Sequence, residues 1–192
     1  MHLLAISPGS GWDAARWRSV LAAGVDALLI REKQLEARPL LDLVRRVQDL
    51  APDLELWVAG RLDVALVAGC GLHAPEAYPV LDPALLPLSR PLHDEGQWQG
   101  RCGAAQLLVA PIGAAPGKGQ PWGTARLRRF LDALPSTGPR LLALGGMHPA
   151  GVAELRHPRL AGVAAIRSLW ETSDPQRVAA EFRARWEDAL PG

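Results

Sequence analysis

Short apolar runs alternate with stretches of helical spacing along the whole chain. Most of the runs are continuous and not alternating, which is typical of parallel strands covered on both faces. Eight runs are predicted to be strands: Leu3–Ser7, Ala27–Arg31, Leu54–Ala59, Gly71–His73, Ser89–His93, Gln106–Pro111, Arg140–Gly145 and Gly162–Ile166. Six stretches are predicted to be helices: Trp12–Ala23, Pro39–Leu50, Leu62–Ala68, Thr124–Leu134, Pro149–Leu155 and Pro175–Leu190.

A strand–helix alternation with eight strands predicts a (β/α)8 TIM barrel, an α/β fold. At 192 residues the barrel would be small, with some helices reduced to turns. A doubly wound open sheet is the alternative, because the two folds differ only in whether the eighth strand closes on the first. The segment Pro75–Leu88 contains four prolines and should hold little helix. No linker or composition break is visible, so we expect one domain over residues 1–192.

Composition excludes several classes of partner. The net charge is +1 and no basic stripe is visible, which argues against nucleic acid. No apolar run reaches the roughly 18 residues of a membrane span, so we expect no membrane partner. Cys70 and Cys102 are far apart and have no metal-ligand spacing, which favours a reduced, cytoplasmic protein.

The two lysines of the chain each follow an apolar run. Lysine and arginine together number 21, so a chain this rich in arginine has little reason to place lysine on an ordinary surface. Lys33 ends the segment that contains Arg31, and Lys118 lies in a glycine-rich loop. Because an ammonium is a compact charge and a guanidinium a planar fork, the two are not interchangeable at an anion site. We therefore predict that Lys33 and Lys118 face one anionic ligand.

Functional groups of a barrel gather where its strands end. Gly145 and Gly146 follow the seventh predicted strand, and Ile166, Arg167 and Ser168 follow the eighth. This is the usual place for a phosphate site, since glycines permit close backbone approach and an arginine adds a bidentate contact. His93 and His73 both end strands and both could transfer a proton near neutral pH, so position alone does not choose between them.

Five segments in order resemble the thiamine phosphate synthase/TenI family. They are residues 26–33 with Arg-Glu-Lys, 61–73 with its Gly-x-His end, 109–118 with a Pro and a Lys, 142–147 with Gly-Gly, and 162–166. The resemblance runs over nearly the whole chain. It implies a (β/α)8 barrel, in agreement with the strand count.

The chain departs from the synthase pattern at the expected metal site. The resemblance implies an enzyme that joins an aminopyrimidine diphosphate to a thiazole phosphate and uses magnesium to stabilise the leaving diphosphate. Gly60 stands where the family has one metal-binding aspartate, and no aspartate follows His73 before Asp82. Glu76 is the only acid nearby. Losing a carboxylate removes both a ligand and a charge from a magnesium site, so we expect no metal and no cofactor.

The segment Ser89–His93 matches instead a Gly-Arg-Ser-Val-His pattern of the TenI branch, with Arg90 and His93 at the same spacing. This resemblance implies a thiazole tautomerase of thiamin biosynthesis, an isomerase that aromatises a carboxy-thiazole phosphate by metal-free proton transfer. His93 would be the catalytic residue. The remaining predicted residues would bind the substrate: Arg31 and Lys33 its carboxylate end, Gly145, Gly146, Ile166, Arg167 and Ser168 its phosphate, and Lys118 a closing lid.

Two other functions stay open at this point. One is a divergent synthase that holds magnesium through Glu76 or Asp63. The other is a non-catalytic barrel that binds a thiazole phosphate or has a regulatory role, because fold does not decide function. In each case the partner is a small phosphorylated thiazole, and the chain could act as a monomer or a homo-oligomer.

Overall fold

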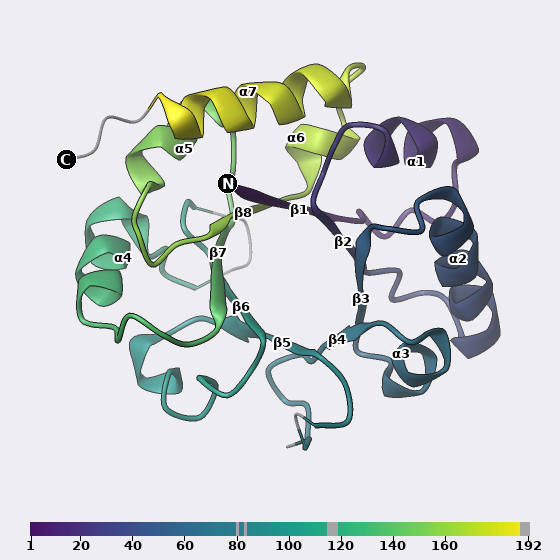
Figure 1. The fold of residues 1–192 in the computed structure, drawn as a ribbon, viewed down its shortest axis with the longest axis horizontal. Helices are drawn as coiled ribbons and strands as arrows, with labels where there is room; N and C mark the ends of the chain where they lie inside the picture. The colour runs from purple at the N-terminus through teal and green to yellow at the C-terminus, as the bar shows by residue number, and fades with distance from the viewer. Residues whose placement is uncertain (80, 83, 115–118, 189–192) are drawn as a thin grey trace.

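The computed structural model describes residues 1–79, 81–82, 84–114 and 119–188. Within these residues, eight parallel strands form a closed barrel in sequence order, ringed by helices (Figure 1). The strands are β1 His2–Ile6, β2 Ala27–Ile30, β3 Glu55–Ala59, β4 Gly71–His73, β5 Leu88–Leu92, β6 Gln106–Val109, β7 Arg140–Leu144 and β8 Gly162–Ala165. The predicted (β/α)8 barrel is confirmed, and the open sheet is wrong because β8 pairs with β1.

The helices of the described residues are α1 Ala14–Leu21, α2 Ala37–Leu50, α3 Leu62–Ala68, α4 Gly123–Asp132, α5 Pro149–Val152, α6 Arg167–Trp170 and α7 Pro175–Glu187, with 3-10 turns η1 Glu95–Gln97 and η2 Ala153–Leu155. Two of them, α5 and α6, have only four residues, as expected for a barrel this short. The described part of the connection between β4 and β5 holds no helix, in keeping with its prolines.

Barrel closure depends on a close approach between β1 and β8. Their register pairs His2 with Gly162, and the His2 N–H donates to the Ala161 carbonyl at 2.8 Å. A Cβ built on Gly162 would lie 1.9 Å from the His2 carbonyl oxygen. Only glycine therefore allows the last strand to reach the first at this distance.

Side chains fill the barrel lumen, so the barrel is a packed core and not a pore. Buried Leu4, Leu29, Leu108 and Leu142 lie there with Trp57, which is 3 % exposed. Trp57 occupies the space beside Gly71, where an added Cβ would lie 2.3 Å from the indole ring. Because side chains fill the lumen, a ligand can bind only at the ends of the barrel.

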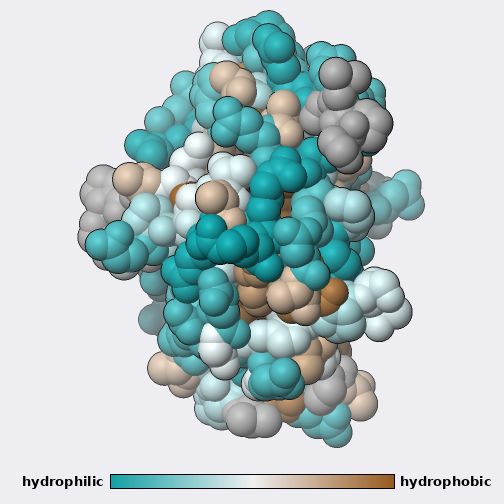
Figure 2. Space-filling model, turned by 90° about the vertical axis from the view of Figure 1, so that its left-hand side faces the viewer, coloured by the Kyte–Doolittle hydropathy of each residue, from teal (hydrophilic) through white to brown (hydrophobic). Residues whose placement is uncertain are grey.

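The barrel surface is mainly polar. On the side that carries α4 and α5, hydrophobic residues form small patches among predominantly hydrophilic ones (Figure 2). Within the described part of the chain, every helix is too short or too polar to cross a bilayer.

Candidate active site

The carboxyl ends of the eight strands converge at one end of the barrel. The residues that follow them are Ser7, Arg31, Gly60, Ala74, His93, Ala110, Gly145 and Ile166. These positions come from distant parts of the sequence and are brought together only by the closed sheet. Most of the predicted site residues fall within this set or one to three positions beyond it; Lys118 falls in 115–118, outside the described residues.

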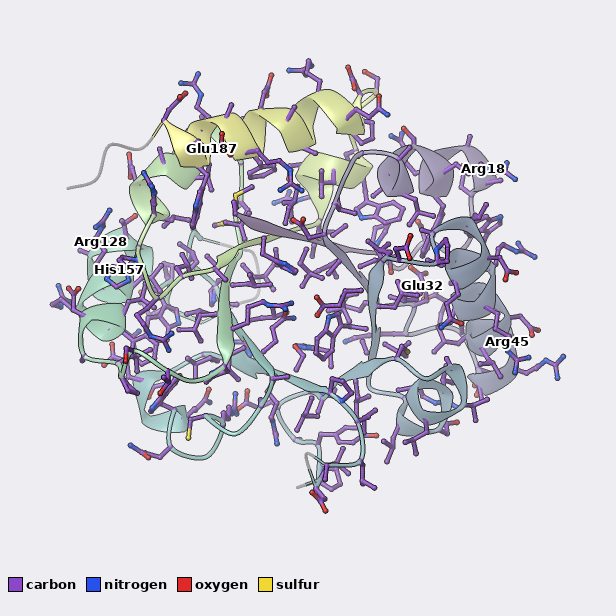
Figure 3. All side chains as sticks on the ribbon, in the orientation of Figure 1. Arg18, Glu32, Arg45, Arg128, His157 and Glu187 are labelled. Carbon is purple, nitrogen blue, oxygen red and sulfur yellow. The ribbon has the colours of Figure 1, made fainter. Side chains whose placement is uncertain are left out.

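The Arg-Glu-Lys segment divides its charges between two roles. Glu32, at 3 % exposure, lies inside the ring of helices beside β2 (Figure 3). Its carboxylate accepts from the backbone N–H groups of Gly9 and Gly11 at 3.2 and 2.7 Å, bracing the loop between β1 and α1. Arg31 and Lys33 have no acidic partner among the described residues, and Lys33 is exposed. Binding of an anion by these two cations stays a prediction.

Glu32 is a structural residue that the sequence analysis missed. The sequence does not show which way the Glu32 side chain points between its two cationic neighbours. Only the structure shows it, because the β1–α1 loop lies over β2 and presents its backbone N–H groups to the carboxylate. The Arg31 N–H completes this brace by donating to the buried Ser7 hydroxyl at 2.8 Å. Together the contacts hold the backbone at the ends of β1 and β2 in one arrangement.

His73 lies at the centre of a cationic region. Its Nδ1 is 2.9 Å from Ser89 Oγ, and the Ser89 hydroxyl is itself buried. Burial, followed by the positive charges of Arg31 and Arg90 and the nearby His93, lowers the pKa of His73 to about 4. The imidazole is therefore neutral at physiological pH.

Stability should depend on pH through His73. Its pKa lies below the ordinary 6.5, so between pH 4 and 6.5 the unfolded chain binds a proton that the folded chain does not. The free energy of unfolding should therefore rise by up to about 3 kcal/mol over this window and fall again on acidification. Urea unfolding at several pH values should show this rise in the parent and a smaller one in His73→Asn. His2, whose pKa is also lowered, contributes equally to both proteins. Equal slopes would contradict the assignment.

His93 is held between two acceptors. Its Nδ1 lies 2.7 Å from the Ala110 carbonyl oxygen and therefore carries the proton, while Nε2 lies 3.6 Å from Glu76 Oε2. Hydrogen bonding and charge from Arg101, then His93 and Arg90, keep the pKa of Glu76 below its ordinary value. An imidazole fixed on one side and facing a carboxylate on the other can hold or move a proton. The assignment of His93 as catalytic stays a prediction.

Carboxylates at this end of the barrel do not fit a magnesium site. Gly60 follows β3 and has no side chain, and Asp63 accepts from Arg61 Nε and Nη2 at 3.0 and 2.7 Å. Glu76 is bound by Arg101 and by Gln97 Nε2 at 2.8 Å. Among the described residues, no three His, Cys, Asp or Glu side chains gather as metal ligands would. The carboxylates of the described residues therefore do not fit the magnesium ion that the family resemblance implies.

The loops after β7 and β8 lie on neighbouring strands. Gly145 and Gly146 have φ angles of +106° and +70°, and the Gly145 carbonyl accepts from the Gly113 N–H at 3.0 Å. A Cβ on Gly145 would be 3.0 Å from Pro111, so glycine permits the close contact of the β6 and β7 loops.

The β8 end contributes Ile166, an exposed Arg167 and Ser168, whose buried Oγ has no hydrogen-bond partner among the described residues. An unpartnered hydroxyl beside a glycine-lined loop suits a phosphate oxygen. The phosphate site at Gly145, Gly146 and Ile166–Ser168 stays a prediction.

Comparisons with known proteins place these features in context. Residues 8–169 match the family described as thiamine monophosphate synthase. The thiamine-phosphate synthase of Moorella thermoacetica is 32 % identical over 180 residues, covering 86 % of this chain and 84 % of that protein. That of Anaeromyxobacter dehalogenans is 31 % identical over 193 residues, covering 93 % and 85 %. A solved thiamine phosphate pyrophosphorylase from Pyrococcus furiosus has a TM-score of 0.84 at 19 % identity, covering 99 % of this chain and 97 % of that one.

The comparisons contradict the prediction of an isomerase. The similar proteins are named synthases, which are transferases, and the TenI branch is not confirmed. The isomerase prediction depended on the spacing of Arg90 and His93, which the sequence presents as an isolated pair. In the structure both belong to a cluster with Glu76 and Arg101. The matching spacing of two residues could not show this cluster, and it was not sufficient to identify the reaction.

Proposed function

Because the chain belongs to the thiamine monophosphate synthase/TenI family, we propose that it is a divergent thiamine-phosphate synthase, a transferase of thiamin biosynthesis. The proposal is supported mainly by Arg31 and Lys33 at the end of β2, which have no acidic partner among the described residues. An open cationic site fits a reaction whose substrates are a diphosphate and a phosphate. The substrates are those implied by the family resemblance, an aminopyrimidine diphosphate and a thiazole phosphate.

The transfer balances without a redox step. A thiazole ring nitrogen forms a bond to the methylene carbon of the pyrimidine, while the bond from that carbon to the diphosphate oxygen breaks. The electron pair leaves with the diphosphate, so negative charge develops on the leaving group. Arg31 and Lys33 would bind the diphosphate, and their positive charges would stabilise the charge that develops on it.

The other substrate would bind across the barrel opening. Gly145, Gly146 and the Ile166–Ser168 turn would hold the thiazole phosphate through backbone N–H groups and the Ser168 hydroxyl. The two anionic groups would then lie near β2 and near β7–β8, with β1 between β2 and β8. The reacting atoms would then meet over the barrel opening, which His73 and His93 border from the neighbouring strands β4 and β5.

The direct test is a condensation assay with both substrates, in EDTA and in magnesium separately. We expect one diphosphate to form for each thiamine phosphate. Chromatography and phosphorus NMR measure the two products. Arg45→Ala changes an exposed residue of α2 that points away from the barrel (Figure 3) and should leave the rate unchanged.

A non-catalytic barrel is the second candidate, favoured by the missing carboxylate at Gly60. It predicts binding of thiazole phosphate by calorimetry and no product under either condition. That result would refute the transferase.

A further inference from the structure

A cavity of about 450 Å³ opens at the amino end of the barrel, the end opposite the candidate active site. Three segments that lead into neighbouring strands line it. Pro52 and Leu54 come before β3. Cys70 comes before β4, and Pro87 comes before β5. Because parallel strands begin at the same end of a sheet, the closed barrel brings these three segments together and gives the cavity a mainly apolar lining.

Exposed apolar side chains border this cavity. Four large hydrophobic side chains are exposed among the described residues, and all four belong to the segments that lead to the cavity: Leu50, Leu66, Val67 and Leu85. Each lies within three residues of one that lines the cavity. Single apolar residues scattered over a surface are ordinary, whereas a group of them beside a cavity marks an interaction surface. We call the cavity and these four side chains the amino-end patch.

The walls of the cavity are fixed parts of the fold. Helices α2 and α3 lie side by side (Figure 1), and Gln48 Nε2 of α2 donates to the Ala68 carbonyl at the end of α3, at 2.9 Å. On its inner side the cavity is bounded by Trp57, whose ring occupies the space beside Gly71. A cavity with fixed walls can receive an apolar side chain without a cost for ordering loops.

Charge around the amino-end patch is negative. Asp49 and Asp53 are exposed and have no ion-pair partner among the described residues. Glu55, which also lines the cavity, is paired with Arg140 at 2.7 Å. From residue 47 to residue 88 the sequence has one basic residue, Arg61, which precedes α3 at the opposite end of the barrel. The patch therefore attracts a positively charged partner.

We propose that the amino-end patch binds a segment of another protein, an amphipathic helix with apolar residues on one face and lysine or arginine beside them. Apolar anchors of the helix would enter the cavity and cover the exposed leucines, as in other complexes of a helix with an apolar groove. Its cations would lie beside Asp49 and Asp53. A second copy of this chain fits less well, because it would bring two acidic surfaces together. An anionic lipid surface is disfavoured for the same reason.

Fluorescence anisotropy with two synthetic helical peptides tests the proposal on the full chain. Both peptides carry leucine along one face; one has lysine at the flanking positions and the other has glutamate. The parent should bind the lysine peptide about tenfold more tightly than the glutamate peptide, and salt should reduce the difference. Equal affinity for the two peptides, or no binding of either, would overturn the proposal.

Polar substitutions in two separate segments locate the binding surface. Leu66→Gln and Leu85→Gln change exposed side chains and so should not disturb the core, and each should weaken binding of the lysine peptide about fivefold or more. The control Glu187→Gln removes an exposed acid from α7, away from α3 in the ring of helices (Figure 3), and should leave Kd unchanged. Unchanged affinity in both leucine variants would show that the patch is not the binding surface.

Two further measurements test the other occupants. Self-association of the parent in sedimentation equilibrium, abolished by Leu66→Gln, would assign the patch to a second copy and overturn the proposal. Binding to vesicles of phosphatidylcholine and phosphatidylserine, lost in the same variant, would assign it to a lipid surface and also overturn the proposal. We expect neither result. The peptide titration requires no turnover, so its outcome does not depend on the reaction that the barrel catalyses.

Discussion

Replacing Gly162 with alanine is expected to cost about 3 kcal/mol or more of stability, enough to unfold much of the protein. The new Cβ would lie 1.9 Å from the His2 carbonyl oxygen and 2.7 Å from its backbone N and C atoms. These are backbone atoms of β1, so no side-chain rotation can relieve the clash. The pairing of β1 with β8 would have to open, and with it the closed barrel.

Gly151→Ala is the matched control for this substitution. Gly151 lies in α5 with no atom within 4 Å of its Cβ position, so alanine should be neutral or stabilising by up to about 1 kcal/mol. Urea unfolding followed by tryptophan fluorescence and circular dichroism measures both variants. A Gly162→Ala protein within about 1 kcal/mol of the parent would show that β1 and β8 are not held this closely.

Arg31→Ala is expected to reduce kcat/KM of the condensation roughly 100-fold, the usual cost of removing one fixed group that stabilises transition-state charge. Arg31 follows β2, its backbone N–H is held by Ser7, and no acid among the described residues neutralises it. Because the charge on the leaving diphosphate grows during the reaction, kcat should fall as well as binding.

Arg45→Ala removes the same side chain from the outer face of α2 and should change kcat/KM less than twofold. Arg31→Lys separates charge from shape, since it keeps the positive charge and loses the fork. We expect it to recover part of the lost rate. Steady-state kinetics of the three variants decides the matter, and an Arg31→Ala enzyme within threefold of the parent would exclude Arg31 from the transition state.

Strand positions were predictable because a strand buried on both faces is a continuous apolar run in the sequence. The run Leu3–Ser7 is shifted by one residue from β1, and the run Ala27–Arg31 extends one residue beyond the end of β2. Helix ends were less exact: α2 begins at Ala37, two residues before the Pro39 that the sequence suggested, since Arg38 and Pro39 both fit a first turn. The single-turn helix α6 was not predicted, because four residues carry no periodicity.

Site residues were predictable only as positions. Arg31 and His93 follow their strands as expected, and Gly145 and Gly146 take the positive φ angles that only glycine adopts easily. The contact of His93 with Glu76, and the capture of Glu76 by Arg101, join segments up to 25 residues apart. Such distances depend on the loops between strands, and no spacing in the sequence encodes them.

The sequence by itself determined the barrel class, the family and the missing carboxylate at Gly60, since each depends on which residue stands at a position along the chain. Tertiary structure alone decided that β8 closes on β1 through Gly162, that Glu32 braces the β1–α1 loop, and that Asp63 and Glu76 pair with arginines. These outcomes depend on separation in space, which closure of the sheet establishes between residues far apart in the chain. The ion pairs of Asp63 and Glu76 at this end of the barrel follow from that closure.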